Sequence, residues 1–469
     1  MGRPQHQTPH TNGEVSFWMK AQRGALQARP ALAGDVRADV AIVGAGLSGL
    51  WAAYHLTSAD PSLRIVVLDA EHVGYGASGR NGGWLSQLIP GDRATYAGGR
   101  HGMAGVAALQ QAMVDGIAEV VSIAADHHLE IDAVRGGNVV VGTTPAAMTR
   151  LQARRAADLR YGLPETGVQQ LTRDELTARI DIHGALGGLH YPDVTRIDPA
   201  KLVLGLATLL EARGVTIHEG SRAETITPGR VTTAGGVLCA PRILIATEGY
   251  SGPLLGARRI IPVNSSMIAT NVLSDADWDR IGWGAMECLS DGAHTFIYAQ
   301  RTADGRIAIG GRGNPYRFGS GTGGDGRTSQ ATVDLLLARL RRYFPGVAVH
   351  AAHAWSGVLG VSRDWCASVQ FDPATGIGHT NGYAGHGVTT AFVASRSLAD
   401  LALGRSTPAT ELPWVGYRSR SWEPEPIRYV GVHAMYRLFR IADAWEERRG
   451  SHDTSLVARF AGHLAGLAH

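Results

Sequence analysis

The sequence predicts an α/β protein in which a discontinuous parallel-sheet domain is interrupted by a second, α+β domain built on an antiparallel sheet. A glycine-rich turn joins a buried strand to a helix near the N-terminus, and further strands of the parallel type begin at residues 214 and 242. Alternating strands, typical of an antiparallel sheet, occupy residues 258–350. The predicted boundaries are an N-terminal arm (1–35), the parallel-sheet domain (36–90, 185–257 and 351–405), the second domain (91–184 and 258–350) and a C-terminal segment (406–469).

The segment 38–69 has the order strand, glycine turn, helix and second strand. The apolar run 38–43 leads into Gly44-Ala-Gly-Leu-Ser-Gly49, which has the G-x-G-x-x-G spacing of a dinucleotide-binding turn. In such a turn Gly44 allows the bend, Gly46 lets the backbone approach a pyrophosphate, and Gly49 lets the helix pack closely. Asp69 ends the second strand, where a carboxylate can accept hydrogen bonds from a ribose. The domain is therefore predicted to be Rossmann-like and to bind a dinucleotide through Gly44, Ala45, Gly46, Leu47, Ser48, Gly49, Asp69 and Ala70.

The remaining elements follow from hydrophobic periodicity and from the residues that begin and end helices. Helices are predicted at 95–128, 144–159, 199–213 with Asp198 as the N-cap, 329–344, 388–403 and 441–449. Strands are predicted at 138–141, 214–218, 242–246, 265–272, 295–300 and 306–310. A second G-x-G-x-x-G match, at 74–79, does not directly follow a strand and is not predicted to be a separate nucleotide site.

Composition excludes several classes of function. The 469 residues are 44% hydrophobic and 18% charged, which is ordinary for a soluble globular enzyme, and the polar segment 1–14 predicts neither a signal peptide nor a membrane anchor. We therefore expect a cytoplasmic protein without a membrane partner. The net charge of +3 comes without a basic run, so no nucleic-acid partner is expected. Three widely spaced cysteines predict neither a disulfide framework nor a metal site.

Three further segments go beyond a generic dinucleotide fold: 76–83, 246–250 and 382–389. Together with the first motif they resemble the D-amino acid oxidase superfamily of FAD-dependent amine oxidoreductases, in particular its γ-glutamylputrescine oxidase and glycine oxidase branch. In the first segment Ser78, Arg80 and Asn81 can donate hydrogen bonds, whereas Gly82 and Gly83 leave space for a flat ring. The resemblance implies that FAD is held by Gly76, Ala77, Ser78, Arg80, Asn81, Gly82, Gly83, Ala223, Ala246, Thr247, Gly385, His386, Gly387, Val388 and Thr389.

Departures from the family pattern refine these expectations. Relatives that attach flavin covalently use a cysteine in the strand matching 355–358 or a histidine near Asn81, and this sequence has neither, so non-covalent FAD is expected. Thr389 stands where sarcosine-oxidase-like relatives bind the substrate carboxylate with a lysine, which favours an amine without an α-carboxylate. Ala308 stands where those relatives place a lysine that helps oxygen to react, so the electron acceptor stays open.

The resemblance implies an FAD-dependent amine oxidase or dehydrogenase that converts an amine to an imine by hydride transfer to flavin N5, with oxygen or another acceptor taking the electrons. For Tyr298, Tyr316 and Trp355 the alternative role is core packing. For Arg301 and Arg312 it is a solvated surface role, and for His386 it is a loop-forming role. The alternative functions are an amino acid oxidase or dehydrogenase, a flavin monooxygenase, an NAD-dependent dehydrogenase and a non-catalytic flavoprotein. The candidate pocket residues are Tyr298, Arg301, Arg312, Tyr316, Trp355 and His386.

Overall fold

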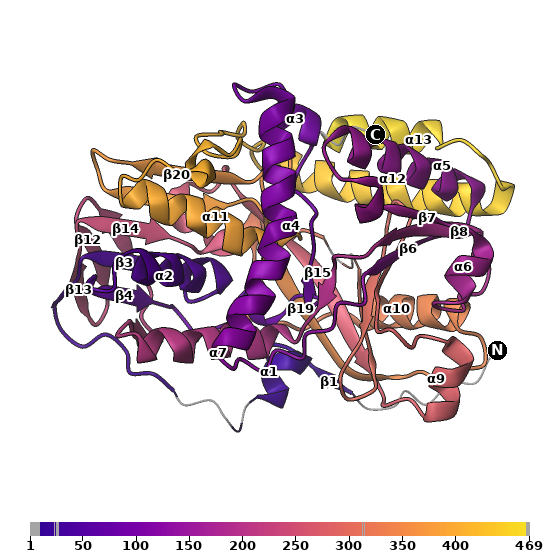
Figure 1. Cartoon of the computed structure of the whole chain (residues 1–469), viewed down its shortest axis with the longest axis horizontal. Helices are drawn as coiled ribbons and strands as arrows, with labels where there is room; N and C mark the ends of the chain where they lie inside the picture. The colour runs from indigo at the N-terminus through magenta and orange to yellow at the C-terminus, as the bar shows by residue number, and fades with distance from the viewer. Residues whose placement is uncertain (1–9, 23, 25–27, 312, 314, 466–469) are drawn as a thin grey trace.

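The computed structural model of the chain describes residues 10–22, 24, 28–311, 313 and 315–465 (Figure 1). Within them, six strands form the sheet β10 (Thr216–His218), β4 (Ile65–Leu68), β3 (Val40–Val43), β14 (Arg242–Ile245), β21 (Ile377–Asn381) and β20 (Ser368–Asp372), in that order. The strands from β10 to β21 are parallel, and β20 is an antiparallel edge strand. The predicted Rossmann-like sheet is therefore confirmed.

Every residue of β3 and β4 is buried, as expected for strands of a parallel sheet. Helix α2 (Leu47–Ala59) packs against α7 (Pro199–Ala212) and α11 (Gly387–Ala402), and α7 begins after Asp198, whose carboxylate accepts the predicted capping hydrogen bonds. A smaller sheet consists of β11 (Thr225–Thr227), β12 (Arg230–Thr233), β13 (Gly236–Cys239) and β2 (Val36–Arg37).

A second, larger sheet forms the other half of the molecule. Its nine strands, counted over the described residues, follow the order β1 (Thr11–Asn12), β19 (Ala351–Val361), β15 (Ile261–Thr270), β18 (Ile307–Gly311), β17 (Tyr298–Arg301), β16 (Cys288–Asp291), β6 (Asn138–Gly142), β8 (Gly187–Tyr191) and β7 (Gln169–Leu171). Most neighbouring pairs are antiparallel, as predicted, although β1–β19 and β16–β6 are parallel. The helices on this side are α5 (Pro145–Arg160), α6 (Arg173–Thr177), α9 (Asp275–Ile281) and α10 (Gln330–Tyr343).

Two strands of this sheet correct the predicted boundaries at residues 185 and 351. Both β8 and β19 lie in segments that the sequence places in the parallel-sheet domain, yet they pair within the nine-stranded sheet. Strand β19 pairs with β15 along almost its whole length, and such pairing depends on a partner distant in the sequence. The rest of the domain division stays a prediction. Short elements complete the framework: α1 (Phe17–Ala21), α8 (Gly252–Leu255), and the pair β5 (Trp84–Leu85) and β9 (Thr195–Arg196).

Helix α4 (Gly102–Asp126) runs between the two halves of the molecule (Figure 1). One long helix was expected from residue 95, but a short α3 (Arg93–Ala97) ends at Gly98, and Gly102 adopts a positive φ of 57°. Helix α4 is long and apolar enough to cross a membrane by length and composition alone. Its buried side chains instead join the core around the six-stranded sheet, which is the behaviour of a central helix in a globular protein.

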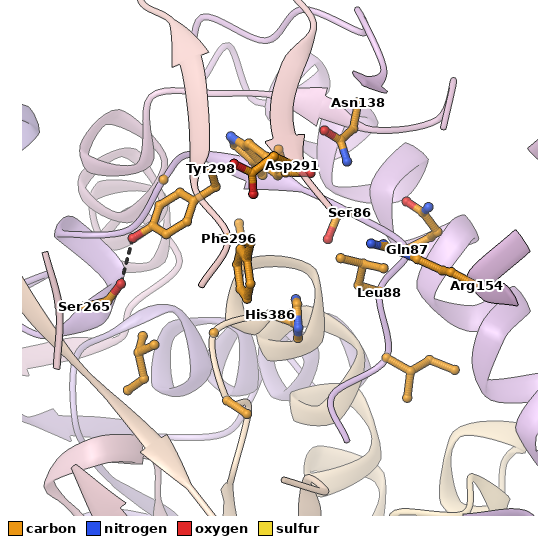
Figure 2. A pocket seen from close by; sticks show the side chains of 18 of the residues that line it. Ser86, Gln87, Leu88, Asn138, Arg154, Ser265, Asp291, Phe296, Tyr298 and His386 are labelled. Atoms are coloured by element: carbon orange, nitrogen blue, oxygen red, sulfur yellow. Dashed lines mark hydrogen bonds between the residues drawn. The ribbon is translucent and has the colours of Figure 1, made fainter. Parts of the chain in front are cut away.

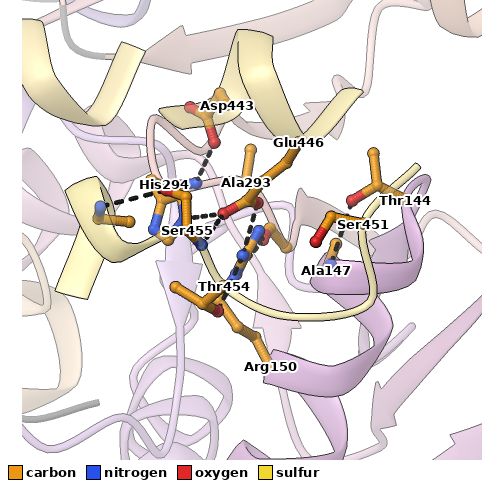
Figure 3. A network of polar contacts seen from close by, with 12 residues as sticks. Thr144, Ala147, Arg150, Ala293, His294, Asp443, Glu446, Ser451, Thr454 and Ser455 are labelled. Carbon is orange, nitrogen blue, oxygen red and sulfur yellow. Dashed lines mark hydrogen bonds and ion pairs between the residues drawn. The ribbon is translucent and has the colours of Figure 1, made fainter. Parts of the chain in front are cut away.

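The C-terminal segment forms two helices, α12 (Ile427–Arg449) and α13 (Leu456–Ala465), which lie beside α5 (Figure 1). The sequence predicted only the last third of α12. Glu446 on α12 is almost inaccessible and binds both Arg150 of α5 and His294, while Asp443 accepts hydrogen bonds from the backbone of His294 and Thr295 (Figure 3). These contacts attach the segment to the nine-stranded sheet.

Candidate active site

The carboxyl ends of β3, β4 and β14 meet at a cavity of about 590 Å³, which we call the inner cavity. It lies where strand order reverses between β3 and β14, the place at which open parallel sheets bind ligands. The predicted cofactor residues in its wall are Gly44, Gly46, Leu47, Ser48, Asp69, Ala70, Gly76, Ala77, Ser78, Asn81, Ala223, Ala246, Thr247, Gly385, Gly387 and Val388.

The glycines of the first turn are required by close contacts. Gly44 has a φ of +110°, and a Cβ there would lie 2.7 Å from the Ala246 carbonyl oxygen. A Cβ on Gly49 would lie 1.9 Å from the Gly44 oxygen, so Gly49 allows close packing although it does not line the cavity. Gly46 lies in the cavity wall, where a Cβ would come within 2.8 Å of the Ser78 hydroxyl. That hydroxyl accepts a hydrogen bond from the Leu47 N–H, so the 76–83 loop holds the start of α2.

Asp69, which follows β4, holds the same turn in place through hydrogen bonds. Its carboxylate accepts hydrogen bonds from the backbone N–H groups of Ala45, at 2.7 Å, and Glu71, at 2.9 Å. Burial raises the pKa of Asp69 and these donors oppose the rise. Each carboxylate oxygen has a second lone pair for a ligand hydroxyl. Ala45 itself lies outside the cavity wall, and it contributes its N–H to Asp69.

A second cavity of about 510 Å³, the outer cavity, continues from the inner one. The two share Ala77, Asn81, Leu359, Gly385 and Val388 in their walls. Figure 2 shows the outer cavity, with His386 and Phe296 between Tyr298 and Ser265 on one side and Gln87 and Arg154 on the other. The arrangement offers a long ligand site beside α2 and a separate chamber for a second molecule.

The 76–83 loop meets the cavities differently from the sequence-based expectation. The guanidinium of Arg80 donates to the carbonyl oxygens of Tyr75, Ser356 and Gly324, so it positions the loop and is not available as a cofactor donor. The Asn81 side chain likewise bonds within its own loop, to Ser78 and Gly83.

The two glycines that end this loop lie close to protein side chains, and Gly82 lines the outer cavity. A Cβ on Gly82 would lie 3.0 Å from the Tyr298 ring, and one on Gly83 would lie 2.3 Å from the Gln300 amide nitrogen. Gly83 is absent from both described cavity walls. Gly83 therefore leaves space for the Gln300 side chain, whereas the expectation that Gly82 accommodates a flat ring stays a prediction.

Strand β17 separates two of the candidate catalytic residues. Tyr298 lines the outer cavity, and its hydroxyl lies 2.9 Å from that of Ser265. Arg301, three residues later, points to the opposite face, where its guanidinium lies over Trp278 at 4.1 Å and donates to the Trp283 carbonyl. Side chains alternate along a strand, so residues an odd number apart cannot share a face. The prediction that Arg301 is a pocket residue is therefore wrong. Because Arg301 lies three residues after Tyr298 on one strand, the alternation of side chains could have shown this.

Two aromatic candidates belong to the core. Trp355 is fully buried and donates to the Arg80 carbonyl at 3.0 Å, which again supports the 76–83 loop. Tyr316 is fully buried and donates to Glu425. Neither residue lines a described cavity, so for both the structure favours the alternative role of core packing, which is usual for large aromatic side chains. Arg312 lies outside the described residues.

The final loop brings His386 to the outer cavity. It is the N-cap residue of α11 and its carbonyl accepts a hydrogen bond from the Thr390 hydroxyl at 2.7 Å. Thr389 is nearly inaccessible and lines neither described cavity, because its hydroxyl accepts the backbone N–H of Ser86 at 2.8 Å. The predicted direct role of Thr389 is therefore corrected to one of holding the segment that carries Gln87 and Leu88.

Sequence reasoning missed Glu248, which joins its own loop to strand β19 and to the loop before α11. Its carboxylate accepts hydrogen bonds from the backbone of Gly360 and, at 2.9 Å, from that of Tyr383. Glu248 adopts a positive φ of 42°, and burial raises its pKa while backbone donors oppose the rise. The sequence did contain one indication of its importance, because Glu248 is an acidic residue within 246–250, one of the three segments that resemble the family.

The C-terminal segment also contributes to the outer cavity, through Phe439 of α12, which stacks on His294. His294, Asp443 and Glu446 are close enough to hold a metal ion. Arg150, His294 and the Ser455 N–H already bind Glu446, however, so the cluster is an ion-pair network that supports the cavity wall (Figure 3). The other wall residues that the sequence did not reveal include Gln87, Leu88, Asn138, Arg154, Ser265, Asp291 and Phe296.

Comparison with known proteins agrees with this geometry. Residues 39–401 match the family described as FAD dependent oxidoreductase. The chain belongs to this family. It is 30% identical to a probable oxidoreductase, OrdL, of Rhizobium meliloti (strain 1021), over 83% of this chain and 89% of that protein. It is 28% identical to gamma-glutamylputrescine oxidoreductase of Escherichia coli (strain K12), over 79% of this chain and 84% of the relative.

Solved structures support the fold of this FAD-dependent oxidoreductase. Glycine oxidase from Geobacillus kaustophilus superposes with a TM-score of 0.66 at 20% identity, covering 79% of this chain and 96% of that one. L-proline dehydrogenase from P. horikoshii has the same TM-score at 15% identity, covering 82% and 98%. The inner cavity fits the family's cofactor, because it combines a glycine turn, a helix N-terminus and a carboxylate at the strand ends. The individual FAD contacts stay a prediction.

Proposed function

We propose that this enzyme oxidises the C–N bond of an amine that carries no carboxylate on the reacting carbon. Bound FAD supplies the chemistry, since it accepts the two electrons that leave the substrate. We further propose that oxygen or another acceptor takes these electrons, and that the enzyme works in the cytoplasm. Gamma-glutamylputrescine, which occurs in the name of the Escherichia coli relative, is one amine of this class.

The observation that carries the proposal is the scarcity of positive side chains where the two cavities join. The shared wall consists of Ala77, Asn81, Leu359, Gly385 and Val388, none of which is charged. Arg80 nearby is bound to carbonyl oxygens, and Arg301 faces away. A carboxylate placed in a dry pocket without a partner is costly. Among the described residues, the join therefore favours a substrate whose reacting carbon bears only the amine.

We expect pentylamine to reduce the enzyme at least about tenfold faster than norleucine, which differs from it only by an α-carboxylate. Anaerobic stopped-flow reduction at equal substrate concentrations measures the two rates directly. A preference for norleucine would contradict the proposal. In that case an increase in the norleucine KM in an Arg312→Ala variant would favour the amino acid oxidase alternative.

The FAD is expected to leave the protein intact when the purified enzyme is denatured by heat or acid. Asn81 and the strand 355–358 lack the groups that attach flavin covalently in relatives, and no cysteine occurs in the described walls of the two cavities. Absorbance of the supernatant after removal of the precipitate gives the released fraction. Flavin fluorescence that stays with the polypeptide on a denaturing gel would contradict this expectation.

His386→Asn is expected to slow reoxidation by oxygen about tenfold, a barrier increase of about 1.4 kcal/mol, and to slow reduction by substrate only modestly. His386 caps α11, whose N-terminal N–H groups favour negative charge, and a positive charge on its side chain would add to that field. Asn keeps a hydrogen-bond donor and cannot carry a positive charge. Stopped-flow measurement of the two half-reactions separates the effects. Lost reduction with normal reoxidation would instead make His386 a substrate base.

A further inference from the structure

The wall of the outer cavity contains several arginines. Four arginines line the described cavity: Arg80, Arg93, Arg150 and Arg154. A guanidinium in a partly buried wall needs partners, because its five N–H groups and its charge lose water there. The partners of each arginine therefore indicate whether a ligand is expected.

Three of these arginines have protein partners. Arg80 is bound by carbonyl oxygens. Arg93 donates to Asp158 at 2.7 Å, and Arg150 donates to Glu446 at 2.8 Å. The other carboxylate in the wall, Asp291, accepts from the Tyr343 hydroxyl and lies 3.7 Å from Arg339, which is outside the wall. Asp158, Asp291 and Glu446 thus each have an arginine nearby, and Asp443 is held by the backbone N–H groups of His294 and Thr295.

Arg154 differs from the other three arginines, because neither a carboxylate nor a carbonyl oxygen binds its guanidinium among the described residues. It projects from α5 into the cavity (Figure 2), and its guanidinium lies over the Tyr191 ring, 5.1 Å from the centroid. Within the part of the chain that the structure describes, no carboxylate oxygen lies within 4.0 Å of its guanidinium. Burial opposes the charge of Arg154, but the Tyr191 hydroxyl and Asp158 favour the charged form and raise its pKa, and the Asp158 carboxylate itself binds Arg93 and the Tyr191 hydroxyl. The wall therefore carries one guanidinium that no carboxylate of the described residues contacts directly.

Two buried amides lie on the same side of the cavity as Arg154 in Figure 2. Gln87 and Asn138 are 2% and 3% exposed, and their side-chain oxygens lack a hydrogen-bond partner among the described residues. These oxygens are acceptors, so each residue can bind a carboxylate only through its NH₂ group. An amide can also turn about its last bond to present its NH₂ group. Neither residue, nor Arg154, belongs to the wall shared with the inner cavity.

We propose that Arg154, with Gln87 and Asn138, binds a carboxylate at the end of the substrate away from the reacting amine. A guanidinium in a cavity wall without a direct carboxylate contact favours an anionic ligand, and its planar fork can bind a carboxylate through two parallel hydrogen bonds. This inference rests on the proposed amine oxidation and specifies its substrate class as ω-amino acids and other amines with a distal carboxylate. The absence of positive charge at the shared wall and its presence at Arg154 would together orient such a substrate with the amine toward the inner cavity.

The test compares unbranched ω-amino acids of four to eight carbons with the alkylamines of the same length, using the FAD-loaded enzyme. For the best chain length, we expect kcat/KM to be at least about tenfold higher for the ω-amino acid. Arg154→Gln should remove this preference by raising KM for the ω-amino acid about tenfold or more, and should change the alkylamine less than about twofold. Arg154→Lys should restore part of the preference, because it keeps the charge and loses the planar fork.

Arg155→Gln is the matched control, since the neighbouring arginine points away from the cavity toward Val168 and Glu165. It should leave both substrate series unchanged. Equal loss for both series in Arg154→Gln, or no preference in the unmodified enzyme, would overturn the proposal. If no amine of either series reduces the enzyme, the proposed function fails, and calorimetric titration with hexanoate and hexanol still decides the subsite. Tighter hexanoate binding that disappears in Arg154→Gln supports it, and equal binding overturns it.

Discussion

Gly46→Val is expected to abolish FAD binding while leaving the protein folded. A Cβ at this position lies in the wall of the inner cavity and only 2.8 Å from the Ser78 hydroxyl, which itself holds the Leu47 N–H at the start of α2. The larger side chain would occupy the space through which the backbone approaches a pyrophosphate. We expect the affinity for FAD to fall at least about a hundredfold, or about 2.7 kcal/mol. Titration of the apoprotein with FAD measures this change.

Gly284→Val provides the control for the added side chain. Gly284 is exposed, and a Cβ there would meet no atom within 4 Å. This variant should bind FAD with the same stoichiometry as the unmodified protein. Circular dichroism should show equal helix content in both variants. Stoichiometric FAD in a folded Gly46→Val protein would contradict the assignment of the glycine turn.

Glu248→Ala is expected to lower the free energy of unfolding by about 3 kcal/mol, because it leaves the N–H groups of Gly360 and Tyr383 without their acceptor. The same change should weaken FAD binding, since these hydrogen bonds hold the 246–250 loop against β19 and against the loop before α11. Urea unfolding followed by tryptophan fluorescence gives the stability change, and FAD titration gives the affinity.

Glu248→Gln keeps the size of the side chain and one acceptor oxygen, so its loss of stability should be smaller than that of the alanine variant. Glu165→Ala serves as a surface control, because the Glu165 side chain is 82% exposed. This substitution should change the free energy of unfolding by less than about 0.5 kcal/mol. If Glu248→Ala and Glu165→Ala had equal effects on stability and on FAD affinity, Glu248 would not be the anchor of these loops.

The nucleotide-binding half was largely predictable because its signals are local. The strand that ends at Val43, the glycine spacing that follows it and the carboxylate at Asp69 lie within one short stretch, and each has a direct physical reason. Asp198 was likewise recognisable as a helix cap from its position before Pro199. Strand partners were less predictable, as β8 and β19 show, because pairing depends on residues far away in the sequence.

The sequence by itself determined the fold class, the FAD-binding turn and the family, because local spacing and backbone preference carry that information. Only the tertiary structure decided which polar side chains face the outer cavity. In the structure, Arg301 points to the opposite face of β17, and Arg80 and Thr389 form hydrogen bonds with backbone groups. Arg154 has no carboxylate partner among the described residues. The direction and the partners of a long polar side chain depend on the elements packed around it, and no local pattern specifies them.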